Sequence, residues 1–278
     1  MMTVYNNNGH KVPVQAMPNG VIIPSNGQMN GHFIYAGDQR HISEVPTQWR
    51  PTNWSRENLL GIKGDIMSFT PSDPSVTRTR ILMIGLVGAG KSSFYNTIDS
   101  VFRNRITQRA TCGSAENSLT KNFSSKLPVS WWNFKIKPSA NDRVHCIAFV
   151  IDATSVDVLS KEDLHKIRTF QELAKERGIV QTVVLTKIDT LCKDVKRDIS
   201  SAVTSPVVET AVQKVADLLR LPRNNVFPMK NYENETELDD KISILALSAL
   251  RQMLHFTEDA LQKKKEEAEH AKWPCNIL

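Results

Sequence analysis

The chain has 278 residues, of which 40% are hydrophobic and 23% charged, and its formal net charge is +6. A chain of this length holds one α/β domain of about 200 residues with further segments at its ends, which excludes a second domain of full size. It contains no apolar run of about eighteen residues and no secretory signal at its start, so we expect a cytoplasmic protein without a transmembrane segment.

The positive charge is concentrated in one region. Residues 78–137 contain ten Lys and Arg against two acidic residues, whereas residues 1–77 contain five of each. Such an excess favours a polyphosphate ligand, an anionic membrane or nucleic acid, and a solvated basic face is the alternative. Because aromatic residues are not interleaved with these charges, we do not expect nucleic acid as a partner.

The first 50 residues are rich in Asn, Gly and Pro and have little periodic apolar content, so residues 1–50 are predicted to be a disordered arm. Residues 51–77 are predicted to be a linker with a short amphipathic helix that ends before Pro71. Residues 259–278 are predicted to be a charged tail.

Residues 78–258 have the pattern of a single domain in which strands and helices alternate. The expected strands are 80–84, 144–151, 179–185 and 225–229, and the expected helices are 91–103, 160–178, 205–220 and 238–256. Ser160 is predicted to begin its helix in a capping box, and Ser205, before Pro206, is predicted to be the N-cap of its helix. This order, with right-handed crossovers, predicts the α/β class: a doubly wound, mostly parallel sheet of the P-loop NTPase type, similar to a G domain. Ligands of such sheets bind at the carboxyl ends of the strands.

A phosphate-binding motif follows the first of these strands. Residues 85–92 (GLVGAGKS) fit G-x-x-x-x-G-K-[ST], in which glycines let backbone N–H groups point at phosphates. Lys91 is expected to reach the β- and γ-phosphates and Ser92 to bind Mg²⁺. A glycine-rich turn without a ligand is the alternative. The candidate phosphate contacts are Gly85, Val87, Gly88, Ala89, Gly90, Lys91, Ser92 and Ser93.

A base-reading motif ends the strand at 179–185. The residues Thr186, Lys187, Ile188 and Asp189 match T-K-x-D. The Asp189 carboxylate can accept from N1–H and N2–H₂ of guanine, a pair of donors that adenine lacks, while Lys187 can lay its stem over the base. The two motifs together predict GTP or GDP with Mg²⁺, and a strand end with a solvated Asp189 is the alternative.

Asp152, at the end of the strand 144–151, offers a rival interpretation. It could be a Walker-B carboxylate that holds Mg²⁺ through water, as in ATP-binding P-loop proteins. In the strand order of GTPases, an Asp at this place is usually structural.

The D-x-x-G motif of guanine-nucleotide hydrolases does not occur after Ser92. Thr120 is the candidate switch threonine and second Mg²⁺ ligand. Without a D-x-x-G loop, the γ-phosphate lacks a sensor and the attacking water lacks an orienting group. We therefore expect weak or no hydrolysis and assign no catalytic residue. A nucleotide-dead pseudo-GTPase that acts through unknown protein partners is the alternative.

The last four residues, CNIL, have the C-a-a-X form with a terminal Leu of the geranylgeranyl type. Prenylation of Cys275 would attach the chain peripherally to a membrane. Acidic residues cancel the charge of the upstream basic run 263–265, so electrostatic attraction to an anionic membrane is weak. An unmodified tail is the alternative.

Several segments resemble the interferon-induced protein 44 and 44-like family. They are residues 80–94 (RILMIGLVGAGKSSF), 143–150 (RVHCIAFV), 231–232 (NY), 237–239 (ELD) and 248–254 (SALRQML), within a similarity that covers about residues 48–258. The resemblance implies a cytoplasmic, interferon-inducible, GTP-binding protein of the antiviral and innate immune response, distantly similar to the small GTPases. It also implies that Asn231 lies in the remaining base-contacting loop.

Two departures from the family pattern bear on enzymatic activity more than on binding. The Cys-Asp-Ser/Thr-x-Gly-Leu segment of the family is missing between Leu127 and Asn141. Some members also begin with a globular domain that residues 1–50 cannot form.

Overall fold

The computed structural model describes residues 47–110 and 143–272, with side chains as far as residue 270, and four short strands before residue 25. The predictions made for Thr120, for Cys275 and for the segment 127–141 lie outside the described residues. By its contacts the chain divides into two compact units, Met1–Pro46 and Thr47–Leu278.

The first unit contains two small antiparallel hairpins. Strand β1 (Val4–Tyr5) pairs with β2 (Lys11–Val12), and β3 (Val14–Ala16) pairs with β4 (Ile22–Pro24). They lie within the range predicted to be a disordered arm, where the composition did not predict any strand.

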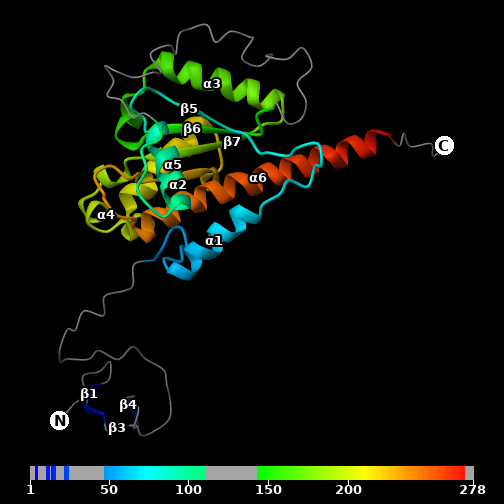
Figure 1. The fold of residues 1–278 in the computed structure, drawn as a ribbon. Coiled ribbons are helices and arrows are strands. Elements are labelled where there is room, and N and C mark those ends of the chain that lie inside the picture. The colour runs from blue at the N-terminus through cyan, green and yellow to red at the C-terminus, as the bar shows by residue number, and fades with distance from the viewer. Residues whose placement is uncertain are drawn as a thin grey trace. The chain divides into compact units, whose positions relative to one another are not determined.

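The second unit is built on a sheet of four parallel strands, in the order β5-β6-β7-β8. They are β5 (Ile81–Ile84), β6 (Cys146–Asp152), β7 (Val180–Thr186) and β8 (Val226–Pro228) (Figure 1). Each predicted strand is present within two residues of its expected ends. Continuous runs of Val, Ile and Leu favour this arrangement because both faces of a parallel sheet are covered. The predicted α/β class is confirmed.

Six α-helices accompany the sheet in the described part of the second unit. They are α1 (Arg56–Ser68), α2 (Lys91–Arg103), α3 (Lys161–Glu176), α4 (Lys193–Arg197), α5 (Pro206–Leu219) and α6 (Asp240–Lys272). The predicted N-caps are confirmed, because the hydroxyl groups of Ser160 and Ser205 accept from the amides of Asp163 and Val208. Helix α6 continues past the predicted end at 256, since the sequence has no Gly or Pro before Pro274.

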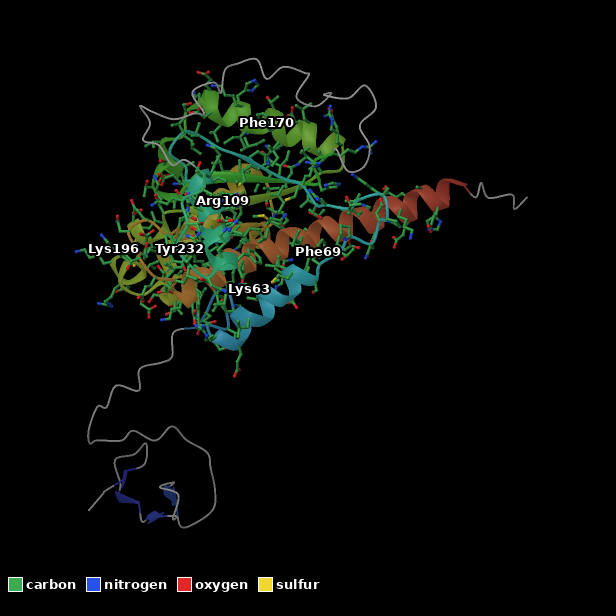
Figure 2. All side chains as sticks on the ribbon, viewed as in Figure 1. Lys63, Phe69, Arg109, Phe170, Lys196 and Tyr232 are labelled. Atoms are coloured by element: carbon green, nitrogen blue, oxygen red, sulfur yellow. The ribbon has the colours of Figure 1, made fainter. Side chains whose placement is uncertain are left out.

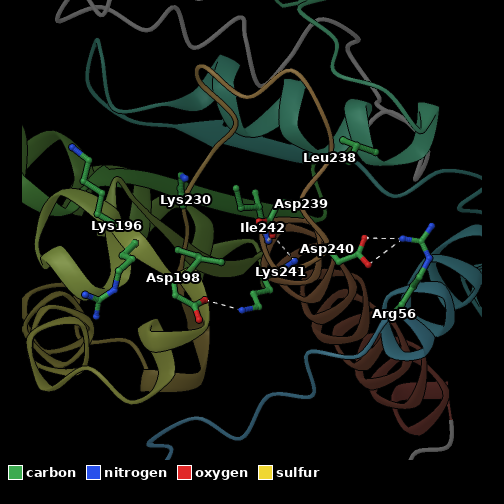
Figure 3. Close-up of a pocket in the computed structure, with 11 residues that line it drawn as sticks. Arg56, Lys196, Asp198, Lys230, Leu238, Asp239, Asp240, Lys241 and Ile242 are labelled. Atoms are coloured by element: carbon green, nitrogen blue, oxygen red, sulfur yellow. Dashed lines mark hydrogen bonds and ion pairs between the residues drawn. The ribbon is translucent and has the colours of Figure 1, made fainter.

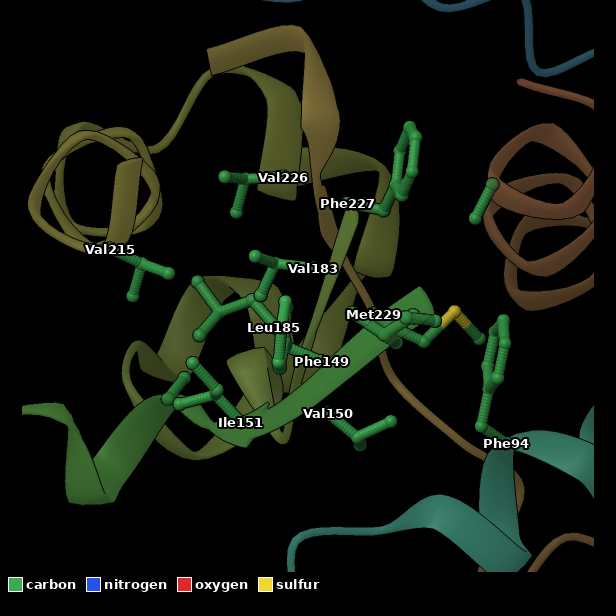
Figure 4. Close-up of a cluster of buried hydrophobic side chains, with 14 of the residues drawn as sticks. Phe94, Phe149, Val150, Ile151, Val183, Leu185, Val215, Val226, Phe227 and Met229 are labelled. Carbon is green, nitrogen blue, oxygen red and sulfur yellow. The ribbon is translucent and has the colours of Figure 1, made fainter. Parts of the chain in front are cut away.

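The helices cover both faces of the sheet. Phe170 of α3 is buried (Figure 2), and the Gln171 side chain donates to the Leu219 carbonyl at the end of α5 at 2.8 Å, so α3 and α5 are neighbours. Figure 4 shows Val215 of α5 on one side of the strands and Phe94 of α2 on the other. Helices α1, α2 and α6 share a second cluster of buried side chains on the α2 side, made by Leu59, Ile62, Val101, Ile244 and Leu247.

Residues predicted to be a linker pack into the second unit. Ile62 of α1 is 1% exposed against α6. Before α1, the Trp49 indole N–H donates to the Ala202 carbonyl at 3.0 Å. None of the helices within residues 47–110 and 143–272 combines the length and apolarity that crossing a membrane requires.

Candidate functional site

The loop between β5 and α2 needs its glycines for two different reasons. Gly88 and Gly90 have φ angles of 77° and 95°, in the left-handed region that glycine adopts without strain. At Gly85 the reason is steric, because an added Cβ would lie 2.1 Å from the carbonyl oxygen of Val150 on β6. The loop is thus a cradle of bare backbone at the carboxyl end of the sheet.

Lys91 places its ammonium group against this loop. Nζ donates to the carbonyl oxygens of Gly85 at 2.9 Å and Leu86 at 2.8 Å. Burial lowers the pKa of Lys91 below its ordinary value. Gly90, the N-cap of α2, has no side chain with which to cover the first amides of the helix, so these amides are arranged as in anion-binding helix N-termini.

Thr186 joins the predicted phosphate loop to the predicted base-reading motif. Its side chain is completely buried, and its hydroxyl donates to the carbonyl of Ala89 at 2.7 Å, with the carbonyl of Ile151 at 3.2 Å. An added Cβ at Gly90 would lie 3.3 Å from Thr186 Cγ2. Two segments separated by about a hundred residues in the sequence are therefore in direct contact.

Lys187 pairs with Asp152 across the ends of β7 and β6. Its Nζ lies 2.6 Å from Asp152 Oδ2, while Oδ1 accepts from the Thr154 amide at 2.9 Å and hydroxyl at 2.7 Å. Burial alone would raise the pKa of Asp152, but the hydrogen bonds from Lys187 and Thr154 outweigh it and lower this pKa. Both carboxylate oxygens are engaged by protein groups, which favours a structural role over the Walker-B interpretation.

Asp189 lies in the 3-10 helix η4 (Ile188–Thr190) and is half-buried. Its neighbour Ile188 is completely buried, and the Ile188 amide donates to the Met229 carbonyl at 3.4 Å, which anchors the turn. Within residues 47–110 and 143–270, no protein group makes a hydrogen bond or ion pair with the Asp189 carboxylate. This carboxylate is therefore available to a ligand.

The loop after β8 lies beside both motifs. The Met229 amide donates to the Leu185 carbonyl at 2.8 Å. Asn231 Nδ2 is 3.2 Å from the position of a Cβ on Gly90, and Asn231 Oδ1 accepts from the Thr97 hydroxyl at 3.5 Å. Asn231, predicted by resemblance, thus meets the phosphate loop and α2. Thr97, completely buried, was missed because its sequence position in α2 carries no signal of this contact.

Two hollows flank these residues. The smaller, of about 140 Å³, lies under the phosphate loop and is lined by residues 84–89, Asp152, Lys187 and apolar side chains of β6 and α3. It is smaller than the roughly 300 Å³ of the smallest ordinary ligand pockets, so it does not enclose a nucleotide by itself.

The larger hollow is a groove of about 670 Å³ between α4 and the start of α6 (Figure 3). Two ion pairs cross its walls, Lys241 with Asp198 at 2.8 Å and Arg56 with Asp240 at 3.1 Å. The bonds from Lys241 and from Ser200 lower the pKa of Asp198 to about 2. The groove carries mostly compensated charge.

The predicted Mg²⁺ site has few protein ligands among the described residues. Among the described residues, no group of three or more His, Cys, Asp and Glu side chains is placed to hold a metal ion. Ser92, in the first turn of α2, is the predicted Mg²⁺ ligand that the structure describes. A magnesium ion here would take most of its ligands from phosphate oxygens and water, as Mg²⁺ commonly does.

Comparison with known proteins identifies relatives of the chain, although no family model matches it. It is 29% identical to the human protein "Interferon-induced protein 44-like", over 80% of this chain and 62% of the relative. It is 25% identical to human and chimpanzee "Interferon-induced protein 44", over 74% of this chain and 58% of each relative. The chain spans about three fifths of the length of these relatives. The resemblance found in the sequence is thereby confirmed: over about three quarters of its length or more, the chain is similar to the interferon-induced protein 44 and 44-like proteins.

Proposed function

We propose that this chain binds a guanine nucleotide, GTP or GDP, at the carboxyl edge of its parallel sheet. The observation that carries the proposal is the hydrogen bond from the Thr186 hydroxyl to the Ala89 carbonyl at 2.7 Å. It brings the predicted phosphate-binding motif and the predicted base-reading motif together at the carboxyl edge of the sheet, where ligands of such folds bind.

At the phosphate end, the cradle would hold the polyphosphate. At Gly88 an added Cβ would meet no protein atom within 4 Å, so a ligand can approach the main chain closely there, and the amides at the start of α2 favour negative charge. The Lys91 ammonium would turn from its two carbonyl partners toward the phosphates. Ser92 would ligate Mg²⁺, which supplies charge neutralisation to the phosphates when bound.

At the base end, Asp189 would accept from N1–H and N2–H₂ of guanine. Its half-buried carboxylate makes adenine unfavourable, because the charge would then lose both partners in a partly desolvated place. The alternative of an ATP-binding protein with Asp152 on the metal is less well supported, since Asp152 is engaged by Lys187 and Thr154.

Hydrolysis is proposed to be weak or absent. The sequence has no D-x-x-G after Ser92, so it lacks the motif that would sense the γ-phosphate and orient the attacking water. The same observation keeps a second candidate open, a pseudo-GTPase that retains the fold and acts only through protein partners.

A titration with fluorescent GTP tests the proposal. Wild-type protein should bind with micromolar affinity, and Lys91→Ala should abolish binding because it removes the positive charge from the cradle. Lys166→Ala, which removes a lysine from the exposed Glu162 pair on α3, is the matched control and should bind as wild type does. No saturable binding by wild-type protein would support the pseudo-GTPase instead.

The choice of base is tested separately. Asp189→Asn should shift preference from guanosine toward xanthosine nucleotides, because the amide can donate to the extra carbonyl of xanthine. Unchanged GTP affinity in Asp189→Asn would refute the base-reading role.

The biological setting is proposed from the names of the relatives. We infer a cytoplasmic, interferon-induced protein of innate antiviral immunity, whose level should rise in cells treated with interferon; no rise would contradict this. Prenylation of Cys275 belongs to the same proposal, and an unmodified C-terminal peptide in mass spectrometry of cellular protein would end it.

A further inference from the structure

The strand order gives Asp152 a central position. Strand β6 lies between β5 and β7, so its last residue stands between the phosphate loop that follows β5 and the base-reading motif that follows β7. Asp152 and Lys187 both line the small hollow under the phosphate loop. A carboxylate placed here would repel a polyphosphate unless a positive group compensated its charge.

Asp152 is fixed more firmly than its partner. Its side chain is 13% exposed, and Oδ1 is held by the Thr154 amide and hydroxyl at the start of the 3-10 helix η3 (Ala153–Val158). Lys187 is 44% exposed, has a flexible stem and itself has a φ of 57°. The short bond of 2.6 Å between them therefore selects one direction for the Lys187 side chain.

We propose that Asp152 is a positioning residue for the base end of the nucleotide site. It holds the Lys187 ammonium toward β6, so that the methylene stem of Lys187, and not its charge, forms the surface on which guanine lies. The ion pair also neutralises Asp152 beside the phosphates. This inference rests on the proposed guanine-nucleotide function. It gives Asp152 a role that differs from binding Mg²⁺ and from stabilising the fold alone.

The experiment measures GTP affinity of Asp152→Asn, of Lys187→Met and of the double variant, each with Mg²⁺ and with EDTA. Asp152→Asn should weaken binding about tenfold in both conditions, since the loss concerns the base and not the metal. In Lys187→Met, the loss should be larger, because Asp152 is left unpaired near the phosphates. The double variant should bind no more weakly than Lys187→Met, since Asp152 acts through Lys187.

Asp157→Asn is the matched control. It makes the same chemical change in the 3-10 helix that Asp152 caps, and it removes an exposed ion pair with Lys214. Asp157 does not line the hollow under the phosphate loop. Its GTP affinity should equal that of wild type. The thermal unfolding midpoint of nucleotide-free Asp152→Asn should stay close to wild type, because partly exposed ion pairs contribute little to stability.

The outcomes separate the explanations. A loss in Asp152→Asn that appears only with Mg²⁺, and that persists in the Lys187→Met background, would overturn the positioning role in favour of a metal role. Wild-type affinity in Asp152→Asn would overturn it while leaving the proposed function intact. Absence of GTP binding by wild-type protein would instead overturn the proposed function and this inference together.

Discussion

At the scale of single residues, the phosphate loop separates two reasons for a glycine. Alanine at Gly85 would place a methyl group 2.1 Å from the Val150 carbonyl oxygen, so β5 and β6 would have to move apart. Alanine at Gly88 would meet no atom within 4 Å, and its cost is the φ angle of 77° alone.

We therefore expect unequal losses of stability. Gly88→Ala should lower the free energy of unfolding by about 1–2 kcal/mol, the cost of a left-handed conformation for a residue with a Cβ. Gly85→Ala should lower it by about 3 kcal/mol or more, in the range of severe overpacking. Urea unfolding measures both. Equal losses in the two variants would contradict the steric role of Gly85.

Residue types predicted helix caps and loop glycines well, because these roles depend on local chemistry. Ser160 and Ser205 were expected at their caps, and Gly88 and Gly90 in a phosphate loop, because each role depends on the nearest few residues. The pairing of Asp152 with Lys187 was not expected, because the spacing of 35 residues does not say which side chains meet.

At the scale of elements, Lys241 ties the first turn of α6 to the 3-10 helix η5 (Ile199–Val203). Its ammonium contacts Asp198 Oδ1 at 2.8 Å, and Asp198 also accepts from the Ser200 amide at 2.9 Å. One of these segments follows the base-reading motif and the other follows the loop of Asn231. The pair therefore connects the chains that leave the two sides of the proposed base site.

This pair should have a measurable pH dependence. The pKa of Asp198 is lowered to about 2 by its bonds with Lys241 and Ser200, so its contribution to stability is complete above about pH 4 and is lost as pH falls toward 2. The side chains of Lys241 and Asp198 are 39% and 45% exposed, and screening limits the contribution to about 0.5–1 kcal/mol.

Asp198→Asn should lower the free energy of urea unfolding by that amount at pH 7, because Asn can still accept from the Ser200 amide but carries no charge. The difference from wild type should shrink between pH 4 and pH 2. Asp194→Asn, which breaks a more exposed pair with Arg197, is the control and should show a smaller effect. A constant difference down to pH 2 would mean that the charge of Asp198 is not responsible.

Elements with a clear apolar period were predictable, and short or context-dependent ones were not. Helix α2 begins and ends at its predicted residues, because the glycines before it and Asn104 after it mark its ends. The five-residue helix α4 was missed, since a helix of this length has little intrinsic stability and depends on packing, here of the fully buried Val195.

At the scale of the whole molecule, the order of the strands decides which motifs meet. The alternation of strands and helices predicted a parallel sheet. The parallel sheet in turn predicted that the ligand site lies at the carboxyl ends of the strands. The sequence does not state that β6 lies between the two motif-bearing strands, because neighbours in a sheet are set by packing of whole layers. Nor did it show where the folded unit begins.

The start of the second unit is set by two residues ahead of α1. The Trp49 amide donates to the Val203 carbonyl at 2.9 Å, and the Arg50 guanidinium donates to the carbonyls of Val226 and Arg223, each at 2.8 Å. Burial, with the nearby charge of Arg223, lowers the pKa of Arg50 to about 10. Arg50 thus supplies donors to β8, the last strand of the sheet.

A comparison of two shortened chains tests this boundary. Residues 47–278 should unfold with nearly the same midpoint as the full chain, since the contacts divide the molecule between residues 46 and 47. Residues 52–278 lose Trp49 and Arg50 and should be less stable by about 2–4 kcal/mol, the sum of several lost hydrogen bonds and the exposed surface that the indole covered. For a unit of this size, the midpoint should fall by about 4–16 °C.

Arg50→Met in the full chain isolates the guanidinium. It leaves the Val226 and Arg223 carbonyls without this partner but keeps the apolar stem, so it should reproduce part of the loss. If residues 52–278 and 47–278 unfold at the same temperature, residues 47–50 add no stability, as expected for the end of the predicted disordered arm. If they differ, the folded unit begins at Trp49 and Arg50, ahead of α1.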